Sequence, residues 1–382
     1  MSNSEWYEEV DPSEIYKLED SKDVEGLIAV LKHSQNKNVI KLAIQALGRL
    51  KDDRAVEPLI DKALKSELVT IRAAAVRALG EIGNPKAVEP LIIVLLKGPT
   101  WDVRQKAAHA LGKIRDARAV GFLITVSEDG DEETSIKEAA AEALGKIAND
   151  GAITALIHML DTSMEEKASL VLKEVGEPAV EHLISALNSK SQTIRERVVT
   201  ILGELGDKMA VKPLLSLLVD ENEDEYFRGD YVATALGKIG DARAVEPLIK
   251  LASKHSEDIL TCMSVRALGD ICDHQAVEPL IAILEDRKTS ECSHLRLETC
   301  WALRKLKDPR AIESLIKILE NPRKTTYGLE DAAASALVEL DDDRIELPLL
   351  KYFKVELDAY DEHWAKAVGK LIARLIKKAK MP

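Results

Sequence analysis

The sequence predicts an all-α protein, an α-α superhelix of the α-solenoid type with about ten to eleven helical hairpins of about 32 residues each. Three observations predict it: a phrase that recurs along the chain, two amphipathic helical segments in each recurrence, and a composition with 46% hydrophobic but only 4% aromatic residues. The phrase stands as DRAVEPLI at 53–60, PKAVEPLI at 85–92, RAVEPLI at 243–249, HQAVEPLI at 274–281 and, more loosely, PRAIESLI at 309–316.

The alanine of this phrase sets the period of the repeat. Its intervals run from 27 to 35 residues, with most near 32, and its positions are Ala55, Ala87, Ala119, Ala152, Ala179, Ala210, Ala244, Ala276 and Ala311. A second phrase follows each copy, as in IRAAAVRALGEIG at 71–83 and IKEAAAEALGKI at 136–147. Each unit therefore contains two segments.

Both segments have the period of an α-helix. In AVEPLIKLA the apolar residues Val245, Leu248, Ile249 and Ala252 stand at i, i+3, i+4 and i+7. In the second segment, the apolar residues between Ile71 and Ile82 form one continuous stripe that is rich in alanine. A single hairpin cannot bury such stripes alone, so neighbouring hairpins are expected to stack and share them.

The ends of the segments are marked as well. Asp or Asn stands in most turns between units, where its side chain can cap the next helix. A glycine falls inside most second segments, about one turn before the end, at Gly80, Gly112, Gly145, Gly203, Gly237 and Gly269. Because glycine weakens a helix interior, we expect these positions to meet a neighbouring backbone closely.

The repeat motif D-x-R-A-V-E-P-L-I, followed by V-R-x-x-A-A-x-A-L-G-x-I-G-D, resembles the HEAT-like repeats of the phycobilisome-lyase (PBS lyase) type. The resemblance covers nearly the whole chain and implies a stack in which the second helices line the concave side. We expect the repeat array to span residues 22–343. Residues 1–21 read as an acidic N-terminal cap or arm, and residues 344–382 as a divergent last helix pair with a basic capping helix.

The negative net charge of the chain bears on which class of molecule it can bind. The chain has 53 Lys and Arg against 66 Asp and Glu, a net charge of −13, which disfavours nucleic acid or an anionic membrane as the main partner. No stretch approaches the roughly 18 apolar residues of a membrane span, and the opening residues MSNSEWYEEV do not read as a signal peptide. These features favour a cytoplasmic location with reduced cysteines.

Motifs for catalysis and cofactor binding are not apparent. The sequence has no phosphate loop, nucleophile elbow or H-E-x-x-H motif, and none of its eight histidines precedes glutamate, as the iron sites of deoxyhypusine hydroxylase would require. Cys272, His274, Cys292 and His294 have the right chemistry for zinc, but a helix between the two pairs separates them. The sequence thus favours a non-catalytic protein without a cofactor.

One basic position recurs at the start of the second helices. It is occupied by Arg72, Arg104, Lys137, Arg195 and Arg296. A ligand-binding stripe is one interpretation. A structural ladder is the other and the favoured one, in which each basic residue reaches an Asp or Asn of the turns between units.

Candidate partner-binding residues come from two places. The outward position of the second helices varies from repeat to repeat and holds Arg77, His109, Arg266 and Trp301. The acidic loop DENEDEYFRGD at 220–230 ends in Tyr226 and Phe227, a pattern that suits a basic segment of another protein. Packing within the fold is the alternative for Trp301, and simple solvation is the alternative for the loop.

The function expected from these observations is a non-catalytic interaction scaffold or adaptor that binds a protein or peptide on its concave face and loop edge. The alternative is a phycobilin lyase-type, chromophore-handling subunit, which rests on the repeat resemblance alone. The identity of the partner and the oligomeric state are left open by the sequence.

Overall fold

The computed structural model describes residues 10–254, 256, 258–286, 293–320, 328–340 and 342–356. The segment expected to form the basic capping helix and Cys292 therefore lie outside the described residues, as do residues 1–9 of the acidic start. The described residues contain helices and no strand, and they divide into two compact units, residues 1–194 (unit 1) and 195–382 (unit 2). In this part of the chain, every helix is too short or too polar to cross a bilayer.

The described part of unit 1 begins with helix α2, which packs against the first hairpin and buries Ile15. After α2 the helices come in pairs up to α11 and α12. In chain order, the helices of unit 1 are α2 (Pro12–Asp20), α3 (Val24–His33), α4 (Lys37–Leu50), α5 (Val56–Lys65), α6 (Val69–Ile82), α7 (Val88–Lys97), α8 (Trp101–Ile114), α9 (Val120–Glu128), α10 (Thr134–Ile147), α11 (Asp150–Met159), α12 (Glu165–Val175) and α13 (Val180–Ala186).

Unit 2 continues the same arrangement, and helix α14 contains the boundary between the units. In the hairpin that α15 begins, the second helix starts as a π-helix, η6, and continues as the α-helix α16. The elements are α14 (Gln192–Leu205), α15 (Val211–Val219), η6 (Phe227–Ala233), α16 (Thr234–Ile239), α17 (Val245–Ala252), α18 (Ile259–Ile271), α19 (Val277–Glu285), α20 (Ser293–Leu306), α21 (Ile312–Glu320), α22 (Leu329–Val338) and α23 (Glu346–Glu356).

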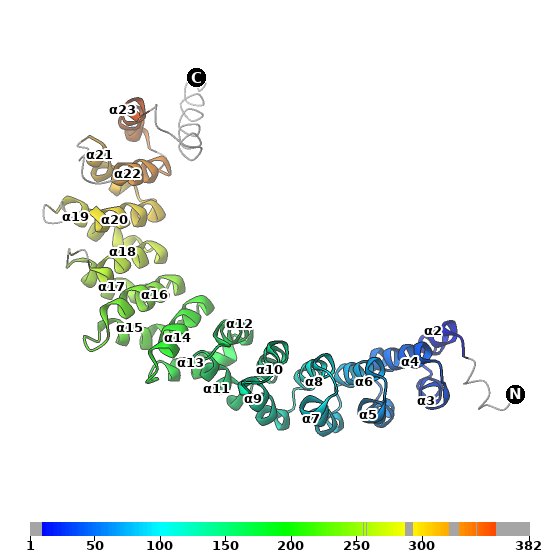
Figure 1. Cartoon of the computed structure of the whole chain (residues 1–382). Coiled ribbons are helices and arrows are strands. Elements are labelled where there is room, and N and C mark those ends of the chain that lie inside the picture. The colour runs from blue at the N-terminus through cyan, green and yellow to red at the C-terminus, as the bar shows by residue number, and fades with distance from the viewer. Residues whose placement is uncertain are drawn as a thin grey trace, which may run out of the picture. The chain divides into compact units, whose positions relative to one another are not determined.

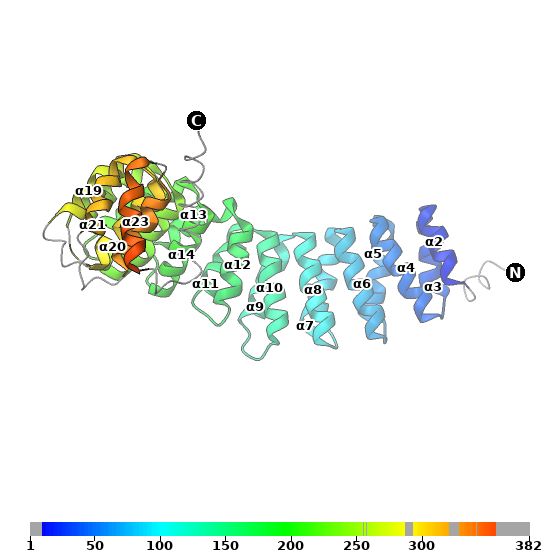
Figure 2. The same cartoon turned by 90° about the horizontal axis from the view of Figure 1, so that it is seen from above.

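Within each unit the hairpins stack so that the first helices form one layer and the second helices form the other (Figures 1 and 2). Among the described residues, unit 1 contains five hairpins, from α3 and α4 to α11 and α12, and unit 2 contains four, from α15 and α16 to α21 and α22. The predicted all-α fold of stacked helical hairpins is thus confirmed. The core is aliphatic and rich in alanine, and Phe227 is its one fully buried aromatic side chain in the described residues.

The second helices approach one another through glycine and alanine. A methyl group added at Gly112 of α8 would lie 2.7 Å from Cα and 3.0 Å from Cβ of Ala143 in α10, distances too short for normal packing. The same contact recurs between Gly48 and Ala78, Gly80 and Ala110, Gly203 and Ala235, Gly237 and Ala267, and Gly269 and Ala302. The expected close backbone approach is therefore confirmed at five of the six predicted glycines, whereas a methyl group at Gly145 would meet the Val171 side chain.

Short 3-10 turns connect most successive hairpins and begin the next one. Asp241 caps one of them, since its Oδ1 accepts a hydrogen bond from the backbone N–H of Arg243 at 3.0 Å. Asp52, Asn84, Asp116, Asp207, Asp273 and Asp308 do the same in their turns. The predicted capping role of these residues is confirmed, and the caps fix where each first helix starts.

The Gly112→Ala variant tests the close approach of the second helices. Overpacking costs about 1–3 kcal/mol, which outweighs the roughly 1 kcal/mol that alanine contributes to helix stability. We therefore expect a lower free energy of unfolding in urea. Gly121→Ala in α9 is the matched control, because a methyl group there meets no atom within 4 Å. Equal effects of the two substitutions would contradict the close contact.

Candidate functional site

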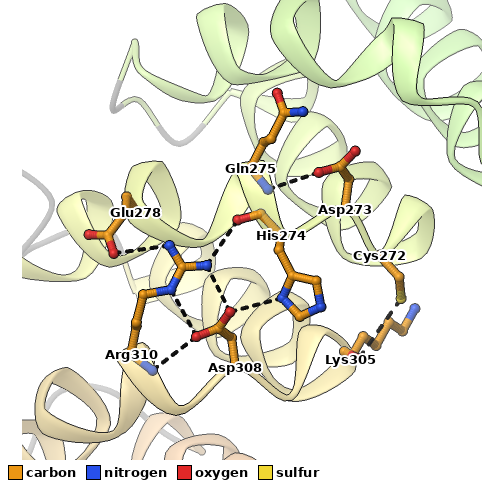
Figure 3. A network of polar contacts seen from close by, with 8 residues as sticks. All are labelled: Cys272, Asp273, His274, Gln275, Glu278, Lys305, Asp308 and Arg310. Carbon is orange, nitrogen blue, oxygen red and sulfur yellow. Dashed lines mark hydrogen bonds and ion pairs between the residues drawn. The ribbon is translucent and has the colours of Figure 1, made fainter.

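The turns between hairpins hold a polar network, which Figure 3 shows for α19 to α21. The Asp308 carboxylate accepts hydrogen bonds from Nε and Nη2 of Arg310, at 2.9 and 2.7 Å, and lies 2.8 Å from Nδ1 of His274. These contacts hold the pKa of Asp308 well below its usual range, mainly through the Arg310 hydrogen bond. Asp52, Asp116, Asp241 and Asp342 bind the arginine two residues later in the same way.

The same arginines also link successive repeats. Arg310 donates to the backbone carbonyl of His274 at 3.2 Å and pairs with Glu278 at 3.2 Å, both in the preceding repeat (Figure 3). Three further pairs repeat this link: Arg54 with Glu25, Arg118 with Glu89, and Arg344 with Glu313. A ladder between repeats therefore exists, and it is made by the arginine of the D-x-R-A phrase on the side of the first helices.

The prediction that the column forms this ladder is wrong for Arg72, Arg104, Lys137 and Arg195, and it stays a prediction for Arg296. Arg72 and Arg104 instead donate to carbonyls near the end of the first helix of their own repeat, those of Ser66 and Leu95. Lys137 donates to the carbonyl of Gly130 at 3.5 Å. The column lies at the start of each second helix, whereas the turn acids lie at its other end, about 20 Å away over 14 residues.

Members of the column also bind acidic residues of the next connecting loop. Arg104 pairs with Glu132, and Arg195 pairs with Glu223 at 3.3 Å. The Arg195 guanidinium lies over the Phe227 ring at 5.4 Å, an attractive cation–π arrangement. Arg296 is buried in α20. Arg72, Arg104, Lys137 and Arg195 therefore hold the connections between the two helices of their own hairpin or of the next one.

The acidic segment 220–230 uses most of its acidic groups internally. Asp220 accepts from the N–H of Asn222, Asp224 caps the N–H of Phe227, and Asp230 raises the pKa of Tyr226 through a hydrogen bond. Phe227 is 1% exposed, so its predicted role in partner binding is wrong. The π-helix turns Phe227 inward beneath Arg195, while Tyr226 stays half exposed.

Two candidate residues lie on the second helices of unit 1. Arg77 of α6 is exposed, and its Nε lies 3.7 Å from Oε1 of Glu81. His109 of α8 lies 3.5 Å from Glu142, and partial burial lowers the pKa of its imidazole. Glu142 in turn pairs with Lys167 of α12. Arg77 thus takes part in an ion pair on the helix surface, and His109 lies beside the ion pair of Glu142 and Lys167.

Arg266 and Trp301, the two candidates in unit 2, line one pocket of about 490 Å³. The pocket lies on the side of the second helices, over α18 and α20 and next to the end of α22. Its lining consists of Arg266, Glu298, Trp301, Ala302, Arg304, Lys305, Lys307 and Glu339. Trp301 is 41% exposed there, so the packing interpretation does not account for its whole side chain.

Ion pairs organise the walls of this pocket. Arg266 donates from both Nε and Nη2 to Glu298, whose side chain is fully buried, and this contact raises the pKa of Arg266. Lys307 pairs with Glu339 at 3.1 Å, and Lys305 pairs with Asp270 of α18. In the part of the chain that the structure describes, the Arg304 side chain forms no ion pair or hydrogen bond.

The sequence pattern did not identify three basic residues of the pocket, namely Arg304, Lys305 and Lys307. The run WALRKLK at 301–307 contains them directly after Trp301. This run could have been noticed as a local basic segment beside an aromatic residue in an acidic chain. Its grouping into one pocket depends on the C-terminal ends of α20 and α22 lying together, and sequence period alone does not give that.

The cysteine and histidine candidates for a metal site do not come together in the described residues. There, no group of three or more His, Cys, Asp or Glu side chains is placed to hold a metal ion, and Cys292 lies outside the description. The Cys272 thiol is exposed and lies 3.0 Å from the Gly269 carbonyl. Burial raises the pKa of the Cys300 thiol to about 12.

The Asp241→Asn variant tests the turn network through pH. Hydrogen bonds from Arg243 lower the pKa of Asp241 from 3.8 to about 2. Because the pKa of Asp241 is lower in the folded than in the unfolded chain, its ionised carboxylate stabilises the folded state above pH 3.8. This contribution is lost as the pH falls toward 2. We expect the stability difference between the native chain and the variant to shrink over that range, as measured by urea unfolding.

Asp207→Asn is the matched control for this measurement. Met209 stands where Arg243 stands in the other turn, and both variants keep an asparagine cap. The control should change stability less and with a weaker pH dependence. An equal pH dependence in the two variants would contradict the role of the arginine.

Comparison with known proteins identifies the family of these repeats. No curated protein matches the chain. Among solved structures, the chain is similar to Kap121p bound to the extreme C-terminus of the protein phosphatase Cdc14p, with 14% identity and a TM-score of 0.56 over 94% of this chain and 44% of that one. Kap121p bound to Nup53p gives 15% identity, a TM-score of 0.56 and the same coverage.

A third similar structure is the complex of CpcE and CpcF of phycocyanin lyase from Nostoc sp. PCC7120, with 26% identity and a TM-score of 0.36 over 58% of this chain and 91% of that one. The chain spans less than half of Kap121p, and that likeness concerns the fold. A family model for HEAT repeats matches residues 24–95, 88–172, 180–261, 222–295 and 245–337. The chain therefore belongs to the HEAT-repeat family.

Proposed function

We propose that the protein is a non-catalytic interaction scaffold or adaptor, and that it binds a partner protein or peptide on the second-helix face of unit 2. The observation that carries this proposal is the pocket beside Trp301. A tryptophan that is 41% exposed beside a cavity of about 490 Å³ is an anchor of the kind that dominates protein interfaces.

The HEAT-repeat fold supports this role. Repeats of this kind expose long surfaces on which side chains vary while the packing positions are kept. Kap121p, which has a similar fold, is described as bound to Nup53p and to the extreme C-terminus of Cdc14p. By analogy of fold, a peptide segment of another protein is the class of partner that we propose here.

The connecting loop at 220–226 contributes less to the proposed interface than its charge indicates. Asp220, Glu223 and Asp224 already bind groups of the same chain. Tyr226 remains half exposed and is the residue of this loop that we retain as a candidate contact. We therefore assign the main contact to the pocket and a secondary one to Tyr226.

Affinity capture with the full chain tests the proposal. The native chain should retain one protein partner in stoichiometric amount, and Trp301→Ala should reduce the retained amount by roughly tenfold or more, as expected when an interface anchor is removed. Trp101→Ala is the matched control, because Trp101 is 55% exposed but lies in unit 1.

Two results would contradict the proposal, the first its assignment of the contact to the pocket and the second the scaffold role itself. One is capture of a partner that both tryptophan variants retain equally, since the pocket would then have no part in binding. The other is covalent transfer of a bilin to an apo-phycobiliprotein by the pure chain, which would establish the chromophore-handling alternative. Circular dichroism of each variant ensures that a loss of binding is not a loss of folding.

A further inference from the structure

The pocket beside Trp301 is basic, although the chain as a whole has a net charge of −13. Four of its lining residues are basic, namely Arg266, Arg304, Lys305 and Lys307, and two are acidic. Both acids already have a partner within the pocket wall, because Glu298 binds Arg266 and Glu339 binds Lys307. Lys305 is also paired, with Asp270 of α18, so the positive charge that remains is that of Arg304, and it favours an anionic group in the pocket.

Arg304 is the residue best placed to bind that group. It stands three residues after Trp301 on α20, so the two side chains lie on the same side of the helix. Its guanidinium has no partner among the described residues. A guanidinium offers two parallel N–H donors that match the two oxygens of a carboxylate.

The remaining surface of the pocket is suited to an apolar side chain. Trp301 presents part of its indole ring, and Ala302 is buried where α18 and α20 approach through Gly269. A cavity of about 490 Å³ lies in the range of roughly 300–1,000 Å³ that is usual for ligand sites. Such a space accommodates one or two side chains of an extended peptide.

We propose that this pocket binds an acidic peptide segment of the partner protein, in which a carboxylate lies next to an apolar side chain. The carboxylate binds Arg304, and the apolar side chain packs against Trp301. This inference rests on the proposed function and adds the chemistry of the partner to it. It also reverses the expectation of a basic partner, which came from the acidic loop.

Selection from a displayed library of random peptides tests the inference. The full chain, Trp301→Ala, Arg304→Glu and Lys212→Glu are used as targets. Lys212→Glu is the matched control, because Lys212 is exposed on α15 and undergoes the same change of charge. We expect the native chain and the control to enrich peptides with net negative charge and a large apolar residue.

An enriched peptide is then labelled and titrated by fluorescence anisotropy. Loss of a charged hydrogen bond or of an aromatic anchor weakens binding by about tenfold or more, so we expect that effect in Arg304→Glu and Trp301→Ala. Lys212→Glu should bind within about twofold of the native chain, because exposed charges away from a site act weakly. A single-stranded DNA probe should bind more weakly than the peptide.

Several results would overturn the inference. These are enrichment of neutral or basic peptides, enrichment that Trp301→Ala retains, binding that Arg304→Glu leaves unchanged, and tighter binding of the DNA probe. If capture still returns a partner that depends on Trp301, the scaffold role stands and only the acidic chemistry fails. If acidic peptides bind but no such partner is captured, the scaffold role fails instead.

Discussion

The close approach of neighbouring second helices is the constraint on which each unit depends. It is possible only where a glycine on one helix faces an alanine on the next, as Gly80 does with Ala110 and Gly237 with Ala267. Larger side chains at these positions would force the backbones apart and open the aliphatic core. The repeated glycine therefore serves packing between hairpins, at a cost in helix propensity that the contact offsets.

Polar contacts then fix both ends of the hairpins. At one end, the turn acids bind the arginine two residues later, and that arginine also reaches the preceding repeat, as Arg310 reaches Glu278. At the other end, Arg104 holds the loop of its own hairpin and that of the next one. The outward side chains of the second helices take no part in these contacts at the hairpin ends. That surface is free to carry residues such as Trp301 for binding.

The sequence predicted those features that depend on short-range pattern. The period, the paired helices, the caps and the reason for the glycines all follow from the spacing of residue types, and the structure confirms them. The partners of the arginine column could not be predicted in the same way. The sequence pattern assigned the turn acids to the column of Arg72, whereas the arginines of the D-x-R-A phrase bind them. The antiparallel course of the hairpin places Arg72 at the far end of its helix from those acids.

Phe227 and Arg304 show the same limit in the candidate site. Phe227 ends an acidic loop and reads as exposed, but a π-helix turns it into the core, and Gly229 allows this by meeting the start of α18 closely. Arg304 reads as an ordinary helix residue. Its importance arises because its neighbours in space are paired with acids while it is not, and such pairing depends on which helices lie side by side.

A double-mutant cycle on Gly80 and Ala110 tests the central claim most directly. A methyl group at position 80 would lie 2.7 Å from Cα and 2.8 Å from Cβ of Ala110. If the helices are in backbone contact, Ala110→Gly should recover part of the stability lost in Gly80→Ala, with a coupling free energy of about 0.5 kcal/mol or more. Strictly additive effects on the free energy of unfolding would show that the two positions do not touch and would contradict the account.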